Sequence, residues 1–262
     1  MDLPPEELQF LTISDILKES ISIPKQSPNT FYLITICLIF PLSFAILAHS
    51  IFTHPILTHL QDNPNGPQTS REWTELLTFQ FCYLIFLFAF SLLSTAAVVF
   101  TVASIYTSKN VSFQSTMSAI PSVLKSGVWH LASVVSVLEP IYGFEAMNKS
   151  YELLNGRSQM AFMLVLGYLM ICGMINGIFG SIVVNGGEDY GIFSRIVVMG
   201  FLVGVLVIVN LVMLLVQSIF YYVCKSYHHQ EIDKSALCNH LGGYLGEYVP
   251  LRSSIQLENM DV

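Results

Sequence analysis

Two long apolar runs separated by a short polar turn constrain this chain more than any other feature of its sequence. The first run, Met160–Val184, has 25 residues and no charge, and the second is Ile196–Val216. A bilayer core of roughly 30 Å needs about 20 apolar residues at a rise of about 1.5 Å each, so either run is long enough to cross it. Because lipid offers no partner to an open backbone, the pair predicts a membrane-spanning helical hairpin closed by residues 185–189.

The composition supports the same class for the whole chain. Of its 262 residues, 53% are hydrophobic and only 11% are charged, against about 25% charged in an average soluble domain. The five cysteines form no C-x-x-C pair, so neither a disulfide framework nor a zinc site is indicated. No nucleophile–base pair, metal-ligand set or phosphate loop stands out. We therefore expect no catalytic residue, no cofactor, no metal and no nucleic-acid partner.

Two further apolar runs precede the hairpin. Phe31–Phe52 has Pro41 near its middle, which predicts a kink. Leu76–Tyr106 carries no charge. The fold class we predict is an all-α integral membrane protein with about four transmembrane helices, supplemented by amphipathic interfacial helices at the N-terminus and in the centre. The four spans are expected at 31–52, 77–106, 160–184 and 196–216.

The N-terminal segment predicts an amphipathic helix over Glu6–Ile23. Thr12 followed by Asp15 is a helix-start pattern, and Pro24 ends the segment. Two placements fit this helix: it lies on the cytosolic membrane surface, or it packs against the bundle. The domain organisation that follows is an N-terminal cytosolic segment, a helical membrane domain and a cytosolic tail, at 1–28, 29–223 and 224–262.

The stretch Gly127–Arg157 predicts a second amphipathic helix that lies on the cytosolic surface and leads into the third span. Its apolar part, Val128–Leu138, has only 11 residues, which is too short to cross a bilayer. Glu139 follows this apolar part, and two roles fit it. It contacts a lipid headgroup or a cation at the interface, or it positions the following helix by pairing with a charge or by capping. The interfacial motif candidates are Glu139, Pro140, Gly143, Ser150, Gly156 and Arg157.

The motif from Val137-Leu138-Glu139-Pro140 to Gly156-Arg157 resembles one in a broad family of multi-pass membrane domains. That family includes the membrane domain fused to some bacterial glycerophosphodiester phosphodiesterases. Over nearly its whole length, the chain is still more similar to an uncharacterised plant family of multi-pass membrane proteins. This similarity rests on the segments FAFSLLSTAAVVFTVASIYTSK, WHLASVVSVLEP and HLGGYLGEYVPLRSSIQLEN.

The resemblance implies a helical membrane fold and no reaction, because in the phosphodiesterase fusions the chemistry belongs to a separate barrel domain. It also implies two more spans between the serine-rich connection and WHLASVVSVLEP. In this chain Lys125-Ser126-Gly127 joins directly to Val128. We therefore expect either a shortened isoform that lacks two spans or the product of an inexact gene model.

Small residues four apart occur on both helices of the predicted hairpin. They are Gly173, Gly177 and Ser181 on the third span, and Gly200 and Gly204 on the fourth. Such spacing lets helix backbones approach closely in lipid, so these residues are our helix-packing candidates. The alternative is that glycine is simply frequent in membrane helices.

The sequence bears on three classes of function: a structural or trafficking membrane protein, a transporter or channel subunit, and an enzyme. A structural, trafficking or lipid-organising protein of the endoplasmic reticulum, Golgi or plasma membrane is favoured, with the lipid bilayer and other membrane proteins as partners. No ionisable side chain lies deep in any predicted span, whereas ion-coupled carriers usually need one. The alternative is a transporter or channel subunit for a small solute, supported by Pro41, Asn176, Asn210 and Gln217. An enzyme is not expected.

The basic residues predict the orientation of the chain. Nine of the eleven fall on one side of the four predicted spans: Lys18, Lys25, Lys109, Lys125, Lys149, Arg157, Lys225, Lys234 and Arg252. Since positive charge is retained in the cytosol during insertion, both termini are expected there. The sequons at Asn110 and Asn148 should then remain unglycosylated in cells, as measured by glycosidase-sensitive mobility. A glycan on either asparagine would contradict this topology.

Overall fold

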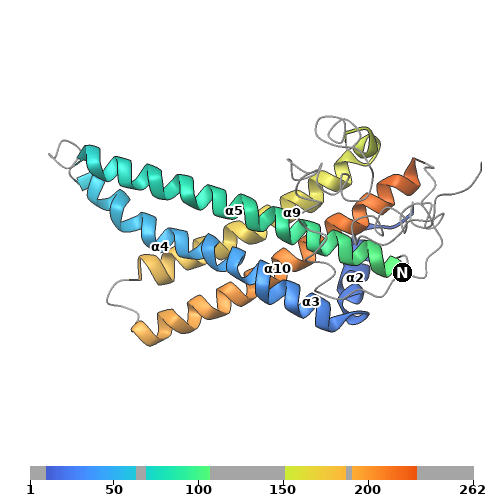
Figure 1. The fold of residues 1–262 in the computed structure, drawn as a ribbon, viewed down its shortest axis with the longest axis horizontal. Coiled ribbons are helices and arrows are strands. Elements are labelled where there is room, and N and C mark those ends of the chain that lie inside the picture. Colours follow the sequence, from blue (N-terminus) through green and yellow to red (C-terminus); the bar gives the residue numbers. More distant parts are fainter. Residues whose placement is uncertain (1–9, 63–68, 107–150, 187–190, 229–262) are drawn as a thin grey trace, which may run out of the picture.

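The computed structural model describes residues 10–62, 69–106, 151–186 and 191–228 (Figure 1). Within these ranges the chain is helical apart from short connections, and no strand is present. Its elements in order are α2 (Ile13–Ser22), η1 (Ile23–Lys25), α3 (Pro28–Ile34), η2 (Thr35–Ile39), α4 (Phe40–Asp62), α5 (Thr69–Tyr106), α9 (Ser158–Phe179), η3 (Gly180–Val184) and α10 (Ile192–Tyr227).

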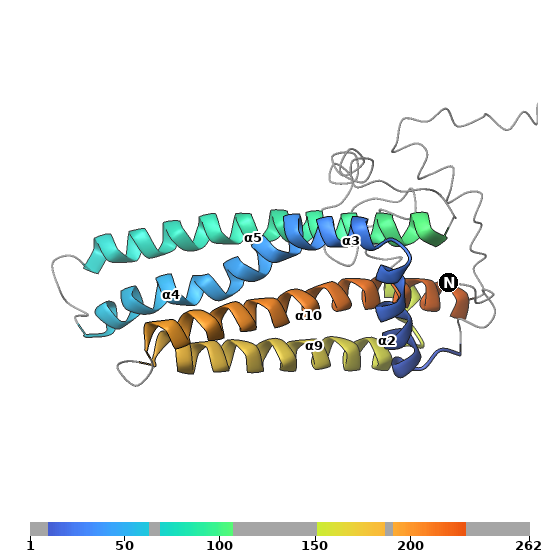
Figure 2. The same ribbon diagram turned by 90° about the horizontal axis from the view of Figure 1, so that it is seen from below.

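Two antiparallel helical hairpins, α4–α5 and α9–α10, lie side by side and form the bundle (Figure 2). Helix α10 packs against α2, α4, α5 and α9, so it connects the two hairpins. Most of its second half is buried, and Leu206, Leu215 and Ile219 are at most 1% exposed. The short helix α2 crosses one end of the bundle, which we call the α2 end (Figure 2).

Within the described ranges, four helices are long and apolar enough to cross a membrane, in agreement with the predicted number. They cover Pro28–Thr58, Arg71–Tyr106, Ser158–Val184 and Ile192–Tyr227, and we refer to them as the candidate spans. The fourth runs eleven residues past the predicted end at 216 and crosses the predicted domain boundary between 223 and 224. The reason is packing: Tyr222, Val223 and Cys224 are at most 2% exposed, so the helix continues where it still contacts its neighbours.

Pro41 lies inside the first candidate span without ending it. A proline has no N–H to donate to the carbonyl four residues earlier, and its ring crowds that carbonyl. The turn directly before it, Thr35–Ile39, is a wider π-helix. A π turn is one way to let an α-helix continue past such a defect.

Helix α2 begins at Ile13, later than the predicted start at Glu6, with the predicted start pattern of Thr12 and Asp15 at its N-cap, and it packs on the bundle. Asp15 Oδ2 accepts hydrogen bonds from the Thr12 hydroxyl at 2.6 Å and from the Thr12 backbone N–H at 3.2 Å. These bonds, the one from the hydroxyl first, hold the pKa of Asp15 below its usual value. Ile16 and Ile23 are buried on the inner side. Of the two placements open from the sequence, the described part of this segment adopts the one packed on the bundle.

The α4–α5 hairpin carries a polar contact far from α2. His49 Nε2 donates to Gln80 Oε1 at 2.8 Å, which assigns the N–H to that ring nitrogen. The imidazole also stacks on the Tyr83 ring, with 4.1 Å between centroids. This histidine is therefore part of the contact between α4 and α5, and it is half-buried.

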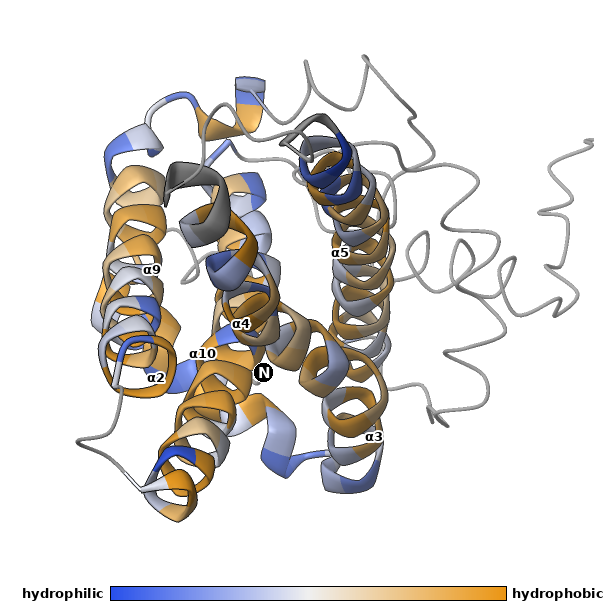
Figure 3. Ribbon diagram, turned by 90° about the vertical axis from the view of Figure 1, so that its left-hand side faces the viewer, coloured by the Kyte–Doolittle hydropathy of each residue, from blue (hydrophilic) through white to orange (hydrophobic). Residues whose placement is uncertain are grey.

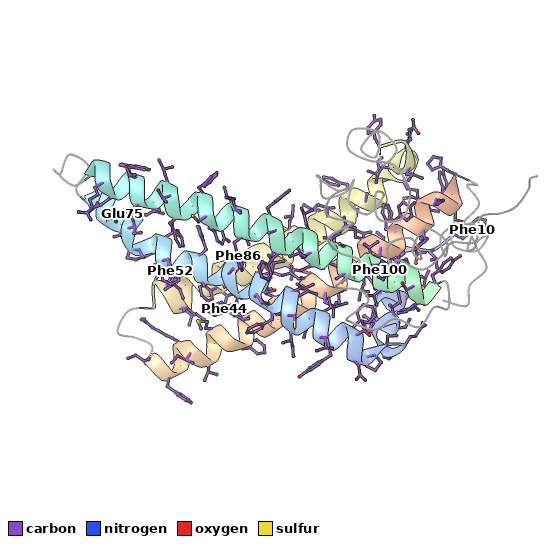
Figure 4. All side chains as sticks on the ribbon, in the orientation of Figure 1. Phe10, Phe44, Phe52, Glu75, Phe86 and Phe100 are labelled. Atoms are coloured by element: carbon purple, nitrogen blue, oxygen red, sulfur yellow. The ribbon has the colours of Figure 1, made fainter. Side chains whose placement is uncertain are left out.

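The outer surface of the bundle is apolar, as expected for helices that face lipid (Figure 3). The phenylalanines show the division between core and surface: Phe100 is 1% exposed, whereas Phe44, Phe52 and Phe86 are 44%, 60% and 37% exposed (Figure 4). Helix α9 contributes the most open face, with long side chains such as Phe162, Leu169 and Met174 exposed.

The glycines of the α9–α10 hairpin do not mediate its packing. A Cβ placed on Gly173, Gly177, Gly200 or Gly204 would meet no neighbouring atom within 4 Å. Ser181 Oγ is exposed and donates to the Gly177 carbonyl in the preceding turn of its own helix. The prediction that these residues bring α9 and α10 together is therefore wrong. The contact is made instead by larger side chains, which include the buried Phe179 and Leu206.

This geometry predicts that the hairpin glycines tolerate large side chains. Gly177→Leu and Gly204→Leu should leave the melting temperature in detergent nearly unchanged, because a Cβ at either position meets no described atom within 4 Å. Leu206→Ala, at 1% exposure, should lower stability by about 2–5 kcal/mol through the cavity it creates. A marked loss of stability in either glycine variant would show that α9 and α10 approach more closely at these positions.

Candidate functional site between α5 and α9

A cavity of about 350 Å³ lies between α5 and α9. Both helices pack on α10, but they barely contact each other, and Figure 3 shows them on opposite sides of α4 and α10. The lining is mostly aliphatic and aromatic, with Leu42 from α4, Leu164 and Leu169 from α9, and Met213 and Phe220 from α10. Ligand sites are typically concave and apolar with a few polar groups, and they occur between the helices of bundles.

A chain of hydrogen bonds borders this cavity and joins three helices. Tyr168 of α9 donates its hydroxyl to Asn210 Oδ1 at 2.8 Å. Asn210 of α10 donates in turn from Nδ2 to Ser43 Oγ of α4 at 2.9 Å. Asn210 is 6% exposed and Ser43 is fully buried. Burying either polar group without its hydrogen-bond partner would lower the stability of the fold.

This chain lies halfway along the helices that carry it. Ser43 is the middle residue of the candidate span Pro28–Thr58, and Asn210 is at the middle of Ile192–Tyr227. Polar side chains at such depth are expensive in hydrocarbon and are commonly paired or functional. Here the pairing is complete for Asn210 Oδ1, which explains how an asparagine is accommodated at this depth.

Hydroxyl groups line the α5 side of the cavity. Ser94 donates to the Phe90 carbonyl at 2.7 Å and Thr95 donates to the Ser91 carbonyl at 2.9 Å, so both use their hydrogen within their own helix. Their oxygens can still accept a hydrogen bond. Ser91 lines the cavity as well, so three hydroxyl-bearing residues of α5 lie on this side.

Gln217 supplies a further polar group, two helical turns from Asn210 on the same side of α10. Its side chain lines the cavity and is half-buried. Unlike Asn210, it forms no hydrogen bond with any residue that the structure describes. A primary amide offers two donors and one acceptor oxygen, so this group can bind a ligand without first losing a bond inside the protein.

Among the residues that the structure describes, the lining contains no Asp, Glu, Lys, Arg or His side chain. A charged group inside such a cavity would be desolvated without an opposite charge to compensate it. Elsewhere in the described ranges, no three His, Cys, Asp or Glu side chains come together as a metal site would need. The arrangement is suited to non-covalent binding of an uncharged or apolar group.

The predicted motif residues Gly156 and Arg157 lie at the α2 end, beside the cavity. Gly156 has φ 89°, a left-handed conformation that favours glycine, and a Cβ there would come within 2.8 Å of the Tyr227 ring. The Arg157 guanidinium lies over the same ring, 5.1 Å from its centroid, and Nη1 donates to the Leu11 carbonyl at 3.4 Å. These contacts join the start of α9 to α2 and to the end of α10.

A second contact holds the same turn. His228 Nε2 lies 3.0 Å from the Asn155 carbonyl oxygen and 3.2 Å from the Leu153 carbonyl oxygen, so this nitrogen carries the hydrogen and donates. Leu154, in the same turn, lines the cavity. The turn thus closes the cavity wall at the α2 end. The other motif candidates, Glu139, Pro140, Gly143 and Ser150, lie outside the described residues, as does the rest of the predicted central amphipathic helix.

The sequence pointed to part of this site and missed the rest. Asn210 and Gln217 were singled out as unusual polar residues, and their spacing of seven already places them on one face of a helix. The roles of Tyr168 and Ser43 were missed, since tyrosine and serine are ordinary in membrane helices. Pro41 and Asn176 do not line the cavity, and Asn176 donates to the Cys172 carbonyl within its own helix.

The hydrogen-bond chain predicts opposite effects for two tyrosine substitutions. Tyr168→Phe leaves Asn210 Oδ1 without its donor and should lower stability by about 1 kcal/mol. Tyr222→Phe removes a buried hydroxyl that has no partner among the described residues, so stability should stay level or rise. Thermal unfolding in detergent compares the two. Equal destabilisation by both would contradict the assigned hydrogen bond.

Comparison with known proteins gives a family and no activity. No curated protein and no solved structure matches the chain. A family model does match, in two segments, at residues 1–127 and 126–260, and the segments meet where Lys125-Ser126-Gly127 joins Val128. The match covers nearly the entire sequence. The chain therefore belongs to the family described as Domain of unknown function (DUF8558).

Proposed function

We propose that this chain is a multi-pass integral membrane protein that organises lipid without catalysing a reaction. In this proposal its four candidate spans cross a membrane of the secretory pathway or the plasma membrane, and a bilayer lipid occupies the cavity between α5 and α9. The observation that carries the proposal is the cavity itself, about 350 Å³ in volume, apolar and uncharged, within helices long enough to span. Lipid is the ligand most abundant in those surroundings.

The distribution of charge supports insertion with both termini in the cytosol. Among the described basic residues, Lys18, Lys25, Arg157 and Lys225 belong to segments at the α2 end (Figure 2). Arg71 and Arg195 lie near the starts of α5 and α10, at the opposite end. The excess of positive charge at the α2 end supports a cytosolic location for that end.

A transporter or channel subunit remains the second candidate function. The observation that favours it is the polar chain of Ser43, Asn210 and Tyr168 at the middle of the candidate spans, because polar groups at that depth often mark a solute path. Solute flux into vesicles containing the purified protein, lost in Asn210→Leu and retained in Asn176→Leu, would support this function over lipid organisation.

Other membrane proteins are proposed as partners alongside the bilayer. No described residue fills the space beside the glycines of α9 and α10, which leaves room for a helix of another protein. Affinity purification from native membranes would identify such partners. No nucleic-acid partner is proposed.

Lipid retention tests the proposed function directly. The protein, purified from native membranes and exchanged into detergent, should retain lipid that mass spectrometry detects at a fixed ratio to protein. Ala161→Phe adds a ring to the cavity wall and should reduce that ratio several-fold. Ile171→Phe, on the same helix but exposed and outside the lining, should not. If both variants retain lipid as the unmodified protein does, the cavity is not the binding site.

A further inference from the structure

The carboxamide of Gln217 distinguishes one part of the cavity from the rest. Seven residues separate it from Asn210, which places it about 10 Å further along the same face of α10, toward the α2 end. The amide of Asn210 is already bonded to Ser43 and Tyr168, and the hydroxyls of Ser94 and Thr95 donate to their own helix. Gln217 is thus the lining group with both donors and acceptor unused by the described residues.

The depth of Gln217 fits the polar group of a lipid. The middle of the candidate span Ile192–Tyr227 is at Asn210, and the half-thickness of a bilayer core is about 15 Å. A group about 10 Å from the middle therefore lies just inside the hydrocarbon boundary. Hydroxyl and ester groups of lipids reach this depth, while their hydrocarbon extends toward the middle of the bilayer.

The absence of charge in the lining restricts the kind of polar group. A carboxylate or phosphate would find no cation among the described lining residues and would lose its hydration on entering. A hydroxyl group needs only one donor and one acceptor, which a primary amide can provide together.

We propose that the cavity selects an uncharged lipid that carries a hydroxyl group, with that hydroxyl bound by the Gln217 carboxamide. The hydrocarbon part lies toward Tyr168 and Leu169. This inference rests on the proposed function, because it specifies which lipid the cavity holds. Long-chain alcohols, acylglycerols and sterols share the required chemistry.

Photoactivatable lipids in vesicles of phosphatidylcholine test the selection. The probes are diazirine analogues of a long-chain alcohol, a diacylglycerol and a sterol, together with the methyl ether of the alcohol, a fatty acid in its carboxylate form, and phosphatidylcholine. At least one hydroxyl-bearing probe should label cavity residues of α9 or α10 about fivefold more than the methyl ether, the difference that one hydrogen bond gives. The diacylglycerol and sterol arms show which source of the hydroxyl is accepted.

Variants then assign the preference to Gln217. Gln217→Leu should abolish the difference between the alcohol and its ether while leaving the labelling by the ether unchanged. Gln217→Met provides an unbranched alternative should leucine disturb folding. The matched control is Asn176→Leu, which removes a half-buried amide that is bonded within α9 and does not line the cavity. Labelling in this control should keep the full preference for the alcohol.

The outcomes separate this inference from the proposed function. Equal labelling of the cavity by phosphatidylcholine and by every hydroxyl-bearing probe, or an unchanged preference in Gln217→Leu, would overturn the selection while lipid binding in the cavity stands. Labelling confined to the outer faces of the helices, combined with lipid retention that Ala161→Phe does not alter, would overturn both.

Discussion

The packing of α10 against four other helices is the interaction on which the rest of the described structure depends. Helices α2, α4, α5 and α9 all contact it, and its buried face carries residues such as Leu206, Leu215 and Ile219. Between helices surrounded by lipid, van der Waals contact and hydrogen bonds stabilise association, because lipid tails are as apolar as leucine. A shape-complementary central helix therefore contributes more here than additional hydrophobicity would. The hydrogen bonds of Asn210 to α4 and α9 fix the register of three helices at once.

The cavity follows from this arrangement. Since α5 and α9 each pack on α10 and barely touch one another, the space between them is filled by no helix of the described chain. Its polar groups come from facing sides of the two hairpins, and those at the middle of the candidate spans are already bonded to one another. The part of the cavity nearer the α2 end, at Gln217, keeps an amide with no described partner. The bonded polar groups thus lie at the middle of the candidate spans, and the amide without a described partner lies two helical turns closer to the α2 end.

The α2 end joins three segments that are distant in the sequence. Arg157 contacts the Leu11 carbonyl before α2 and the Tyr227 ring at the end of α10, and His228 donates to carbonyls of the turn before α9. Gly156 permits the left-handed turn that brings Arg157 into this position. Leu154 in the same turn lines the cavity, so this set of contacts adjoins the cavity wall.

The sequence by itself determined the number of long apolar helices in the described ranges and the capping pattern of Thr12 and Asp15 at the start of α2. Apolar length and capping depend on residues close together in the sequence, so local patterns suffice for them. The end of α10 at Tyr227 depends on packing against neighbouring helices, and the sequence placed it too early. Only the tertiary structure decided which faces meet. Gly177 and Gly204 have the spacing of a close contact and make none, whereas Ser43 and Asn210, separated by 167 residues, form a buried hydrogen bond. Partners in a membrane bundle depend on shape and on polar groups brought together from distant segments, and neither property is encoded in the periodicity of a single helix.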